Sequence, residues 1–299
     1  MGPFNRLAFC IFGLACVSII VDADVVFSLK NILKCGFDPL KILDVGANAG
    51  VWSKTVQSEV FPQAKYFLVE ANDRHRDLLR ASGFPFEIAL VGKDEGQVTF
   101  FKSIVHHEKD TQTGNSVFRE NTESFDKSDQ IVTNITTIDN IIKKRNLGPF
   151  EFMKLDIQGS ELAALHGAIE SLRHVEVVLT EAQVMNYNNG APTFLDLHKF
   201  MEDNGFALYD VCDLMRHAKT RTLIQVDVVW VKKKSFLWSK DCTDFPIPQQ
   251  FNLAEEDLDK SNKKSSKNTK TASYSTATSS RSKAKKQAQK QRKKDLSVE

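Results

Sequence analysis

The stretch 42–53, ILDVGANAGVWS, decides how the rest of the chain is interpreted. Its apolar run ends at Asp44 and leads into small residues, which is the pattern of a buried parallel strand followed by a turn and a helix. Gly46 and Gly50 allow a ligand to approach the backbone closely, and a helix N-terminus offers free N–H groups to an anionic group. The stretch has neither a P-loop nor a G-x-G-x-x-G fingerprint, so a small anionic group fits better than a dinucleotide pyrophosphate. An ordinary strand-to-helix turn without a ligand is the alternative.

A second strand is expected at 65–70, KYFLVE, and it ends at Glu70. In a doubly wound sheet an acid at this place can accept hydrogen bonds from both hydroxyls of a ribose. The carboxyl ends of neighbouring parallel strands form the edge where such sheets bind ligands. Glu70 is therefore a candidate ribose ligand, with a surface acid at a strand end as the alternative.

A third acidic strand end follows in 153–168, MKLDIQGSELAALHGA. Asp156 ends the strand, and Gln158 and Glu161 are expected to face the same crevice. Paired carboxylates could hold a divalent cation or take a proton from a hydroxyl group. The alternative is that Ser160 caps the following helix and that Glu161 only complements the positive end of that helix.

The rest of the chain up to about residue 238 alternates strand and helix signals, which predicts an α/β layered fold. Helices are expected at 50–60, 73–82, 138–145, 160–172 and from 193 to about 205. Strands are expected at 41–45, 65–70, 86–90, 97–103, 150–157, 175–180, 206–211 and 223–232. The last two strands are expected to form an antiparallel pair at one sheet edge.

Composition separates the two ends of the chain from the part expected to fold. The 299 residues suit one large domain or two small ones, and an apolar content of 41% is enough for a core. Residues 260–294 hold 13 basic and no acidic residues, so 239–299 is predicted to be a disordered basic tail. Only five Cys are present and no CxxC spacing occurs, so neither a disulfide scaffold nor a structural metal is expected.

The first 23 residues have the pattern of a targeting segment. An uncharged run at 7–21 is followed by a possible cleavage site after Ala23, which favours a signal peptide, with a retained signal anchor or a buried first helix as alternatives. We therefore expect a location in the secretory pathway, in the ER or Golgi lumen or secreted. Such routing leaves Cys35, Cys212 and Cys242, with at most one disulfide among them. The basic tail argues the other way, because such tails are commoner in cytosolic or nuclear proteins.

The three acidic segments together resemble the FkbM-type methyltransferases, a branch of the class I S-adenosylmethionine (SAM)-dependent enzymes. The resemblance spans about residues 40–233. Its markers are DVGANAG at 44–50, VEA at 69–71, IAL at 88–90, TID at 137–139, KLDIQGSE at 154–161 and LHGA at 165–168. Each marker alone is weak, and the set is specific.

The resemblance implies a Rossmann-like class I methyltransferase fold, with a seven-stranded, mostly parallel sheet flanked by helices, over residues 24–238. It also implies that the methionine part of SAM lies on the first loop, the ribose on Glu70 and the adenine near Ala89 and Leu90. The candidate cofactor-binding residues are Asp44, Gly46, Ala47, Asn48, Gly50, Glu70, Ala71, Ala89, Leu90 and Asp156. The chain departs from the wider pattern at Asn48, where the generic loop has a glycine, and at Gln158, where an acid is common; the second departure weakens a metal site.

Methyl transfer needs alignment, desolvation and removal of a hydroxyl proton. Asp156 is the first candidate for the base, followed by Glu161 and Glu181. The resemblance implies O-methylation of a hydroxyl on a glycan or small molecule, with a hydroxyl-bearing acceptor as the partner and no structural metal. The alternatives are an RNA or protein methyltransferase whose basic tail contacts polyanions nonspecifically, a SAM-binding interaction protein without catalysis, and a nicotinamide-dependent dehydrogenase.

Overall fold

The computed structural model describes residues 24–102, 116–118, 129–185, 188, 190–239 and 242. All of them belong to the unit Met1–Ile247. The targeting segment expected at 1–23 lies outside the described residues, and so does the tail expected at 239–299, apart from residues 239 and 242. No helix of the described ranges combines the length and the apolar character needed to cross a membrane.

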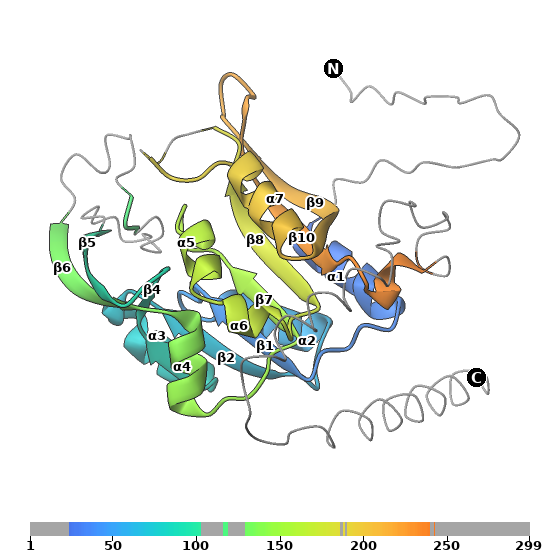
Figure 1. The fold of residues 1–299 in the computed structure, drawn as a ribbon, viewed down its shortest axis with the longest axis horizontal. Coiled ribbons are helices and arrows are strands. Elements are labelled where there is room, and N and C mark those ends of the chain that lie inside the picture. The colour runs from blue at the N-terminus through green and yellow to red at the C-terminus, as the bar shows by residue number, and fades with distance from the viewer. Residues whose placement is uncertain are drawn as a thin grey trace, which may run out of the picture. The chain divides into compact units, whose positions relative to one another are not determined.

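A seven-stranded sheet forms the centre of the fold, in the order β3-β2-β1-β7-β8-β10-β9 (Figure 1). The strands are β1 (Lys41–Val45), β2 (Lys65–Glu70), β3 (Phe86–Ile88), β7 (Phe152–Leu155), β8 (Val177–Gln183), β9 (Phe206–Arg216) and β10 (Leu223–Lys232). Strands β3, β2, β1, β7 and β8 pair in parallel, and β10 is antiparallel to both β8 and β9. The mostly parallel sheet and its antiparallel edge pair are therefore confirmed.

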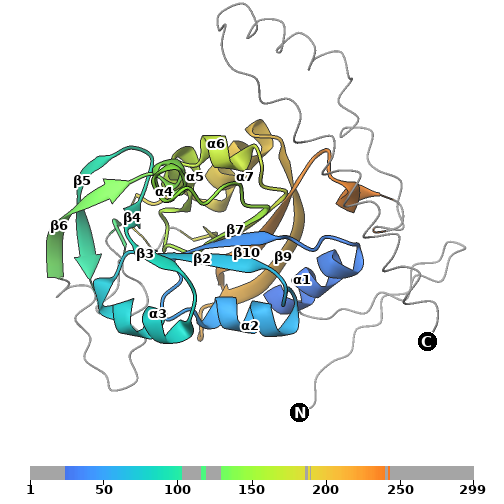
Figure 2. The same ribbon diagram turned by 90° about the horizontal axis from the view of Figure 1, so that it is seen from below.

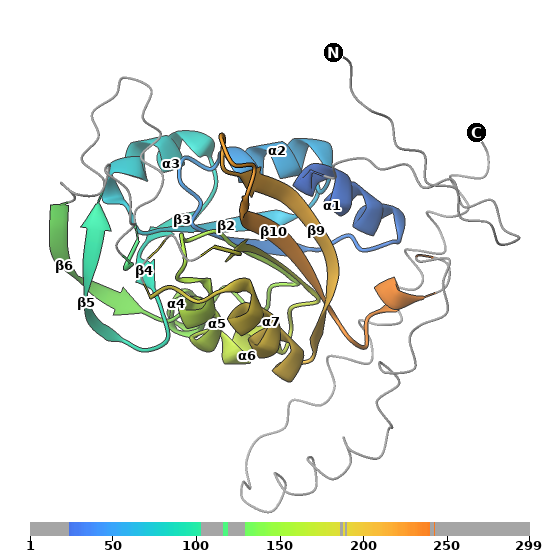
Figure 3. The same ribbon diagram turned by 90° about the horizontal axis from the view of Figure 1, so that it is seen from above.

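Helices cover both faces of this sheet (Figures 2 and 3). One face carries α1 (Val25–Lys34), α2 (Val51–Glu59) and α3 (Arg76–Ser82), with the short turn η1 (Asp73–His75) before α3. The other face carries α4 (Ile138–Arg145), α5 (Glu161–His166), α6 (Ile169–Leu172) and α7 (Phe194–Asp203). Each face has its own apolar core cluster, as expected for a three-layer α/β domain.

Helix α1 was not predicted from the sequence. Its N-cap Asp24 accepts a hydrogen bond from the backbone of Phe27, and Asp213 on β9 accepts one from the Val25 N–H. Leu29 and Ile32 are fully buried on its inner face. The helix therefore packs firmly against the β9 edge of the sheet.

A second, three-stranded sheet lies beyond β3, in the order β4-β6-β5. Its strands are β4 (Leu90–Val91), β5 (Gly96–Lys102) and β6 (Asp129–Thr136). The strand predicted at 86–90 is therefore divided: β3 belongs to the main sheet and β4 to the second one. The backbone turns at Ala89, whose N–H donates to the carbonyl of Glu70 at the end of β2.

The prediction of a single helix at 160–172 is wrong, because the structure has two short helices, α5 and α6, in its place. The Asp139 carboxylate on α4 accepts hydrogen bonds from the N–H groups of Glu170 and Ser171, and so satisfies free amides at the start of α6. A Cβ at Gly167 would overlap the carbonyl oxygen of Gly92. The break between α5 and α6 thus lets the backbone that follows β4 pack closely against Gly167. Apolar periodicity alone does not reveal such a break.

Candidate active site

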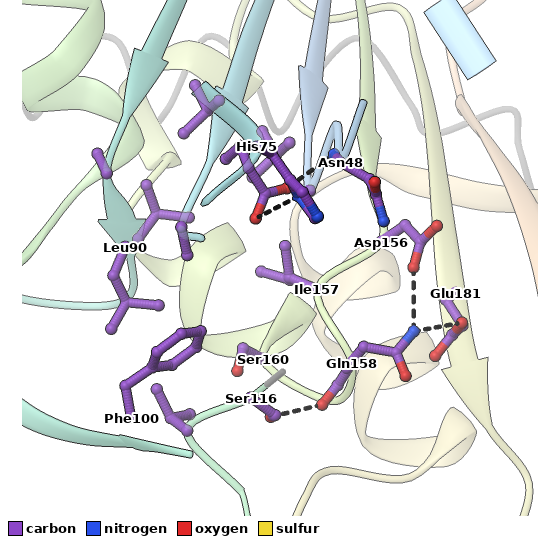
Figure 4. Close-up of a pocket in the computed structure, with 18 residues that line it drawn as sticks. Asn48, His75, Leu90, Phe100, Ser116, Asp156, Ile157, Gln158, Ser160 and Glu181 are labelled. Carbon is purple, nitrogen blue, oxygen red and sulfur yellow. Dashed lines mark hydrogen bonds and ion pairs between the residues drawn. The ribbon is translucent and has the colours of Figure 1, made fainter. Parts of the chain in front are cut away.

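A cleft opens at the carboxyl ends of β1, β2, β7 and β8 and is closed on one side by the second sheet (Figure 4). It contains about 800 Å³ of space that no protein atom fills, including its open mouth. Most of the residues predicted to form the site line this cleft: Gly46, Asn48, Glu70, Ala71, Ala89, Leu90, Asp156 and Glu181. Asp44, Ala47, Gly50 and Glu161 were predicted as well, and they do not line it.

Glu70 is held in place by the backbone around it. Its two carboxylate oxygens accept hydrogen bonds from the N–H groups of Asn48 and Asn72, each at 2.7 Å. Each carboxylate oxygen has a second lone pair, so these two bonds leave acceptor capacity for a ligand. Glu70 is 9% exposed and lines the cleft, which suits an acceptor for hydroxyl groups.

Asp44 lies near the end of β1 and does not line the cleft. It is fully buried, accepts a hydrogen bond from Ser53 at 2.6 Å and lies 3.2 Å from the Lys154 ammonium. Lys154 also donates to the carbonyl of Gly46 at 3.3 Å and lies 3.4 Å from Asp156. Asp44 therefore shapes the loop through Lys154, which the sequence analysis did not single out.

Burial opposes the charge of the Lys154 ammonium, yet the carboxylates of Asp44 and Asp156 outweigh burial and raise its pKa above the ordinary value. The ammonium also lies over the ring of Trp52, 5.4 Å from the ring centroid. Lys154 is therefore a permanent buried cation that connects the loops after β1 and β7.

The backbone conformation and the neighbouring segments explain why the loop has glycine at positions 46 and 50. Gly46 has φ +80°, and a Cβ on it would overlap the carbonyl oxygen of Asp156. Gly50 has φ +75° and lies immediately before α2, where a Cβ would be 3.1 Å from the side chain of Leu68. Both positions therefore need glycine for the backbone itself, and Gly46 also lines the cleft.

Asp156 and Glu181 approach each other at the other end of the cleft, and Gln158 lies between them. The Gln158 amide nitrogen donates to Asp156 at 3.3 Å and to Glu181 at 3.2 Å (Figure 4). Glu181 also accepts from the Gln225 amide at 2.7 Å. Burial, together with the charges of Asp156, Glu161 and Asp227, raises the pKa of Glu181 well above its ordinary value.

Two further carboxyl groups lie close to this end. Glu161 is 5% exposed and accepts from the backbone N–H of Ile157 at 2.8 Å, so it supports the loop after β7 from within. Burial raises the pKa of Glu161 to about 7, against backbone hydrogen bonds that lower it. Asp227 lies opposite Glu181 in the β8–β10 register, and burial with the charge of Asp156 raises its pKa to about 7.

Sequence reasoning missed several residues of the cleft. His75 is 5% exposed, and its Nδ1 atom lies 3.9 Å from Glu70 and has no hydrogen-bond partner among the described residues. The buried hydroxyl of Ser160 has no partner in that part of the chain either, and the ring of Phe100 comes from the second sheet. The turn η1 brings His75 back to β2, and no short sequence motif predicts this placement.

These residues fit SAM by their chemistry. Glu70 and the Nδ1 atom of His75 suit a ribose, and the apolar Ala89 and Leu90 suit an adenine. The end of the cleft with Asp156 and Glu181 suits the positive charges of the methionine part. Within the described part of the chain, no group of three or more His, Cys, Asp or Glu residues is arranged to hold a metal ion.

The order of the main sheet, with its one reversed strand, and a cleft at the carboxyl ends of the strands define the fold class as that of class I SAM-dependent methyltransferases. The family model "Methyltransferase FkbM domain" matches residues 44–208, which is more than half of the chain. The chain therefore belongs to the FkbM methyltransferase family, as the motifs suggested.

Solved structures that are similar to the chain include the following two. An FkbM methyltransferase from Methylobacillus flagellatus has 19% identity and a TM-score of 0.40; the match covers 63% of this chain and 43% of that one. A magnesium protoporphyrin IX methyltransferase from Synechocystis with bound SAM has 10% identity and a TM-score of 0.38, covering 70% and 76%. The chain thus spans less than half of the Methylobacillus protein. No curated protein sequence matches the chain.

Proposed function

We propose that the chain transfers the methyl group of SAM to a hydroxyl oxygen of a glycan or small molecule. When bound, SAM supplies a methyl group on a positively charged sulfur. The observation that carries the proposal is the carboxylate pair of Asp156 and Glu181, which share the Gln158 amide at one end of a cleft whose other end carries Glu70. The cleft thus offers a nucleoside site at one end and a proton acceptor at the other.

Binding is the task of the Glu70 end of the cleft. Glu70 is fixed by two backbone N–H groups and needs no reorganisation to accept ribose hydroxyls. His75 adds a buried, unpaired ring nitrogen at the same place. At the other end, Asp156 is partly exposed and suits an ammonium group, because its negative charge is only partly compensated by Lys154.

Proton removal is the task we assign to Glu181. Its raised pKa makes its ionised form a stronger base than an ordinary carboxylate, and the amides of Gln158 and Gln225 fix its orientation. Glu181 would take the proton of the acceptor hydroxyl as that oxygen is methylated. Glu161 is assigned no contact with the reactants, because it supports the loop after β7 from within.

The charge of this end bears on the class of acceptor. Asp156, Glu181 and Asp227 lie together, and Lys154 is already engaged by Asp44 and Asp156. A polyanion such as RNA would meet repulsion here, whereas a neutral hydroxyl compound would not. This favours a glycan or small molecule over the nucleic-acid alternative.

The experiment is transfer of labelled methyl from SAM by the full chain into pools of glycans, small hydroxyl compounds, RNA and proteins. We expect label in a hydroxyl-bearing glycan or small molecule. Glu181→Gln should lower the rate by roughly 10² to 10⁴ with little change in SAM affinity. Asp156→Asn should weaken SAM binding, and Asp77→Asn, at an exposed pair on α3, is the matched control.

Several outcomes would contradict this proposal. Label found only in RNA or protein would establish the alternative acceptor class, and SAM binding without transfer into any pool would favour a non-catalytic role. If Glu181→Gln keeps the full rate while Asp156→Asn loses it at unchanged SAM affinity, Asp156 is the base. If the chain binds NAD and not SAM, the alternative of a nicotinamide-dependent dehydrogenase is favoured.

We also propose that residues 1–23 direct the chain into the secretory pathway and that the basic tail contacts polyanions nonspecifically. N-terminal sequencing of protein from its native cells should find a chain that starts at Asp24, and an intact cytosolic chain starting at Met1 would refute secretion. Deleting 260–299 should weaken heparin binding without changing methyl transfer; unchanged heparin binding would refute the role of the tail.

A further inference from the structure

Two thiols meet at the end of the domain that lies away from the cleft. Cys35 directly follows α1, and Cys242 follows the turn η3 (Phe236–Trp238), which comes after β10. The Cys242 sulfur lies 3.9 Å from the carbonyl oxygen of Cys35, and the two thiols are within hydrogen-bonding reach of each other. Burial raises the pKa of Cys35 to about 11, and the adjacent Cys242 thiol adds to the rise.

Contacts of the described residues hold Cys242 and the turn before it in place. Trp238 packs edge-on against Tyr209, with 5.3 Å between ring centroids, and its indole N–H donates to the carbonyl of Lys232. The Cys242 N–H donates to the carbonyl of Ser239. Helix α1 lies beside β9 (Figure 3), so the thiols approach each other as a result of the fold.

The third cysteine of the described residues is placed differently. Cys212 on β9 is 1% exposed, and its neighbours are Ser28, Asp210, Asp213 and Asp227. Nothing places it beside Cys35 or Cys242. An odd set of three cysteines therefore resolves into one pair and one isolated thiol.

We propose that Cys35 and Cys242 are a site of disulfide formation, by exchange with a small-molecule disulfide such as oxidised glutathione. One cysteine thiolate attacks a sulfur of that disulfide and releases one thiolate as the leaving group. The second cysteine, after losing its proton, attacks the mixed disulfide and releases the other. Two protein thiols are thereby oxidised to one bond, and the added disulfide is reduced to two thiols.

Such a bond would tie the N-terminal helix to the segment after β10. The two cysteines are 207 positions apart, and cross-links across long segments restrict the unfolded chain most. Neither cysteine lines the cleft. The bond should therefore raise stability and leave methyl transfer unchanged, and it would persist in an oxidising compartment and be reduced in the cytosol.

The test treats the full chain with oxidised glutathione in mildly alkaline buffer and maps its peptides without reduction. We expect a peptide that links Cys35 to Cys242, with Cys212 still free to react with an alkylating reagent. Reduction should lower the Tm of the oxidised protein by roughly 5 to 15 °C. Cys35→Ser and Cys242→Ser should each abolish this difference, and Cys212→Ser is the matched control that keeps it.

Different results would overturn the proposal. If Cys35 and Cys242 both remain open to alkylation after oxidation, the pair does not cross-link. If the mapped bond involves Cys212, the pairing is wrong. A Cys35–Cys242 bond whose reduction leaves the Tm unchanged would refute its stabilising role. The mapping needs no variant, so it decides the pairing even if a serine variant fails to fold.

Discussion

Replacing Lys154 by Met tests whether this buried cation holds the loops after β1 and β7 together. The methionine keeps most of the volume and removes the cation that lies 3.2 Å from Asp44 and 3.4 Å from Asp156. Asp44 is fully buried and Lys154 is 5% exposed, so the variant leaves a carboxylate in the interior without a compensating charge. Removing one partner of a buried ion pair costs about 3 to 5 kcal/mol of unfolding free energy.

The assay is urea unfolding of the wild type, of the single variants Lys154→Met and Asp44→Asn, and of the double variant Lys154→Met, Asp44→Asn. We expect the single variant to lose about 3 to 5 kcal/mol and the double variant to recover part of that loss, because it buries no lone charge. Lys30→Met is the matched control. Its ion pair with Glu59 joins two half-exposed side chains and should be worth less than about 1 kcal/mol.

The reasoning would be refuted by a loss below about 1 kcal/mol in Lys154→Met, equal to that of the control. It would also be refuted if the double variant were less stable than the single one by the full cost of Asp44→Asn alone. In that case the two residues would contribute independently and the buried pair would not be the link between the loops.

Three further perturbations test separate parts of the account. Asp227→Asn should stabilise the protein by roughly 1 to 4 kcal/mol at pH 8 and hardly at pH 4, as measured by urea unfolding. The reason is that the pKa of this carboxyl is raised from 3.8 to about 7 in the folded protein, so its ionisation opposes folding as the pH rises from 3.8 through 7. An equal effect at both pH values would contradict this. His75→Ala should raise the Kd for SAM by roughly 3- to 10-fold in calorimetry, the value of about one hydrogen bond; unchanged affinity would remove His75 from the site. Gly46→Ala should lower the Tm and abolish SAM binding, because its Cβ would overlap the Asp156 carbonyl; a stable variant that binds SAM normally would show that the loop after β1 is placed differently.

The sequence predicted the parts of the fold that depend on local pattern. Continuous apolar runs ending in Asp44, Glu70 and Asp156 marked the central parallel strands, and the edge pair from 206 onward was also recognised. The second sheet was missed as a unit, because β4 contains only two residues and its partner β6 begins nearly forty positions later. Local sequence pattern does not show which strands so far apart in the sequence pair with each other.

The candidate site was predicted to a similar extent. Glu70, Asp156 and Glu181 all reach the cleft, because strand ends share one edge of the sheet. Asp44 and Glu161 were both predicted as site residues, yet the Asp44 carboxylate is paired with Lys154 and the Glu161 carboxylate accepts a hydrogen bond from the backbone of its own loop. The alternation of a strand gives the face of a residue, but it does not reveal which buried partner satisfies its charge.

The most direct test of the central claim is a calorimetric titration of the full chain with SAM, repeated with Glu70→Ala after its fold has been checked by circular dichroism. We expect one binding site, no binding of NAD, and a Kd at least about 10-fold higher in the variant, because each lost charge-assisted hydrogen bond to a ribose hydroxyl is worth about 1.5 to 3 kcal/mol. A folded wild-type chain that does not bind SAM, or a folded Glu70→Ala variant that binds it with unchanged affinity, would contradict the assignment of the cleft.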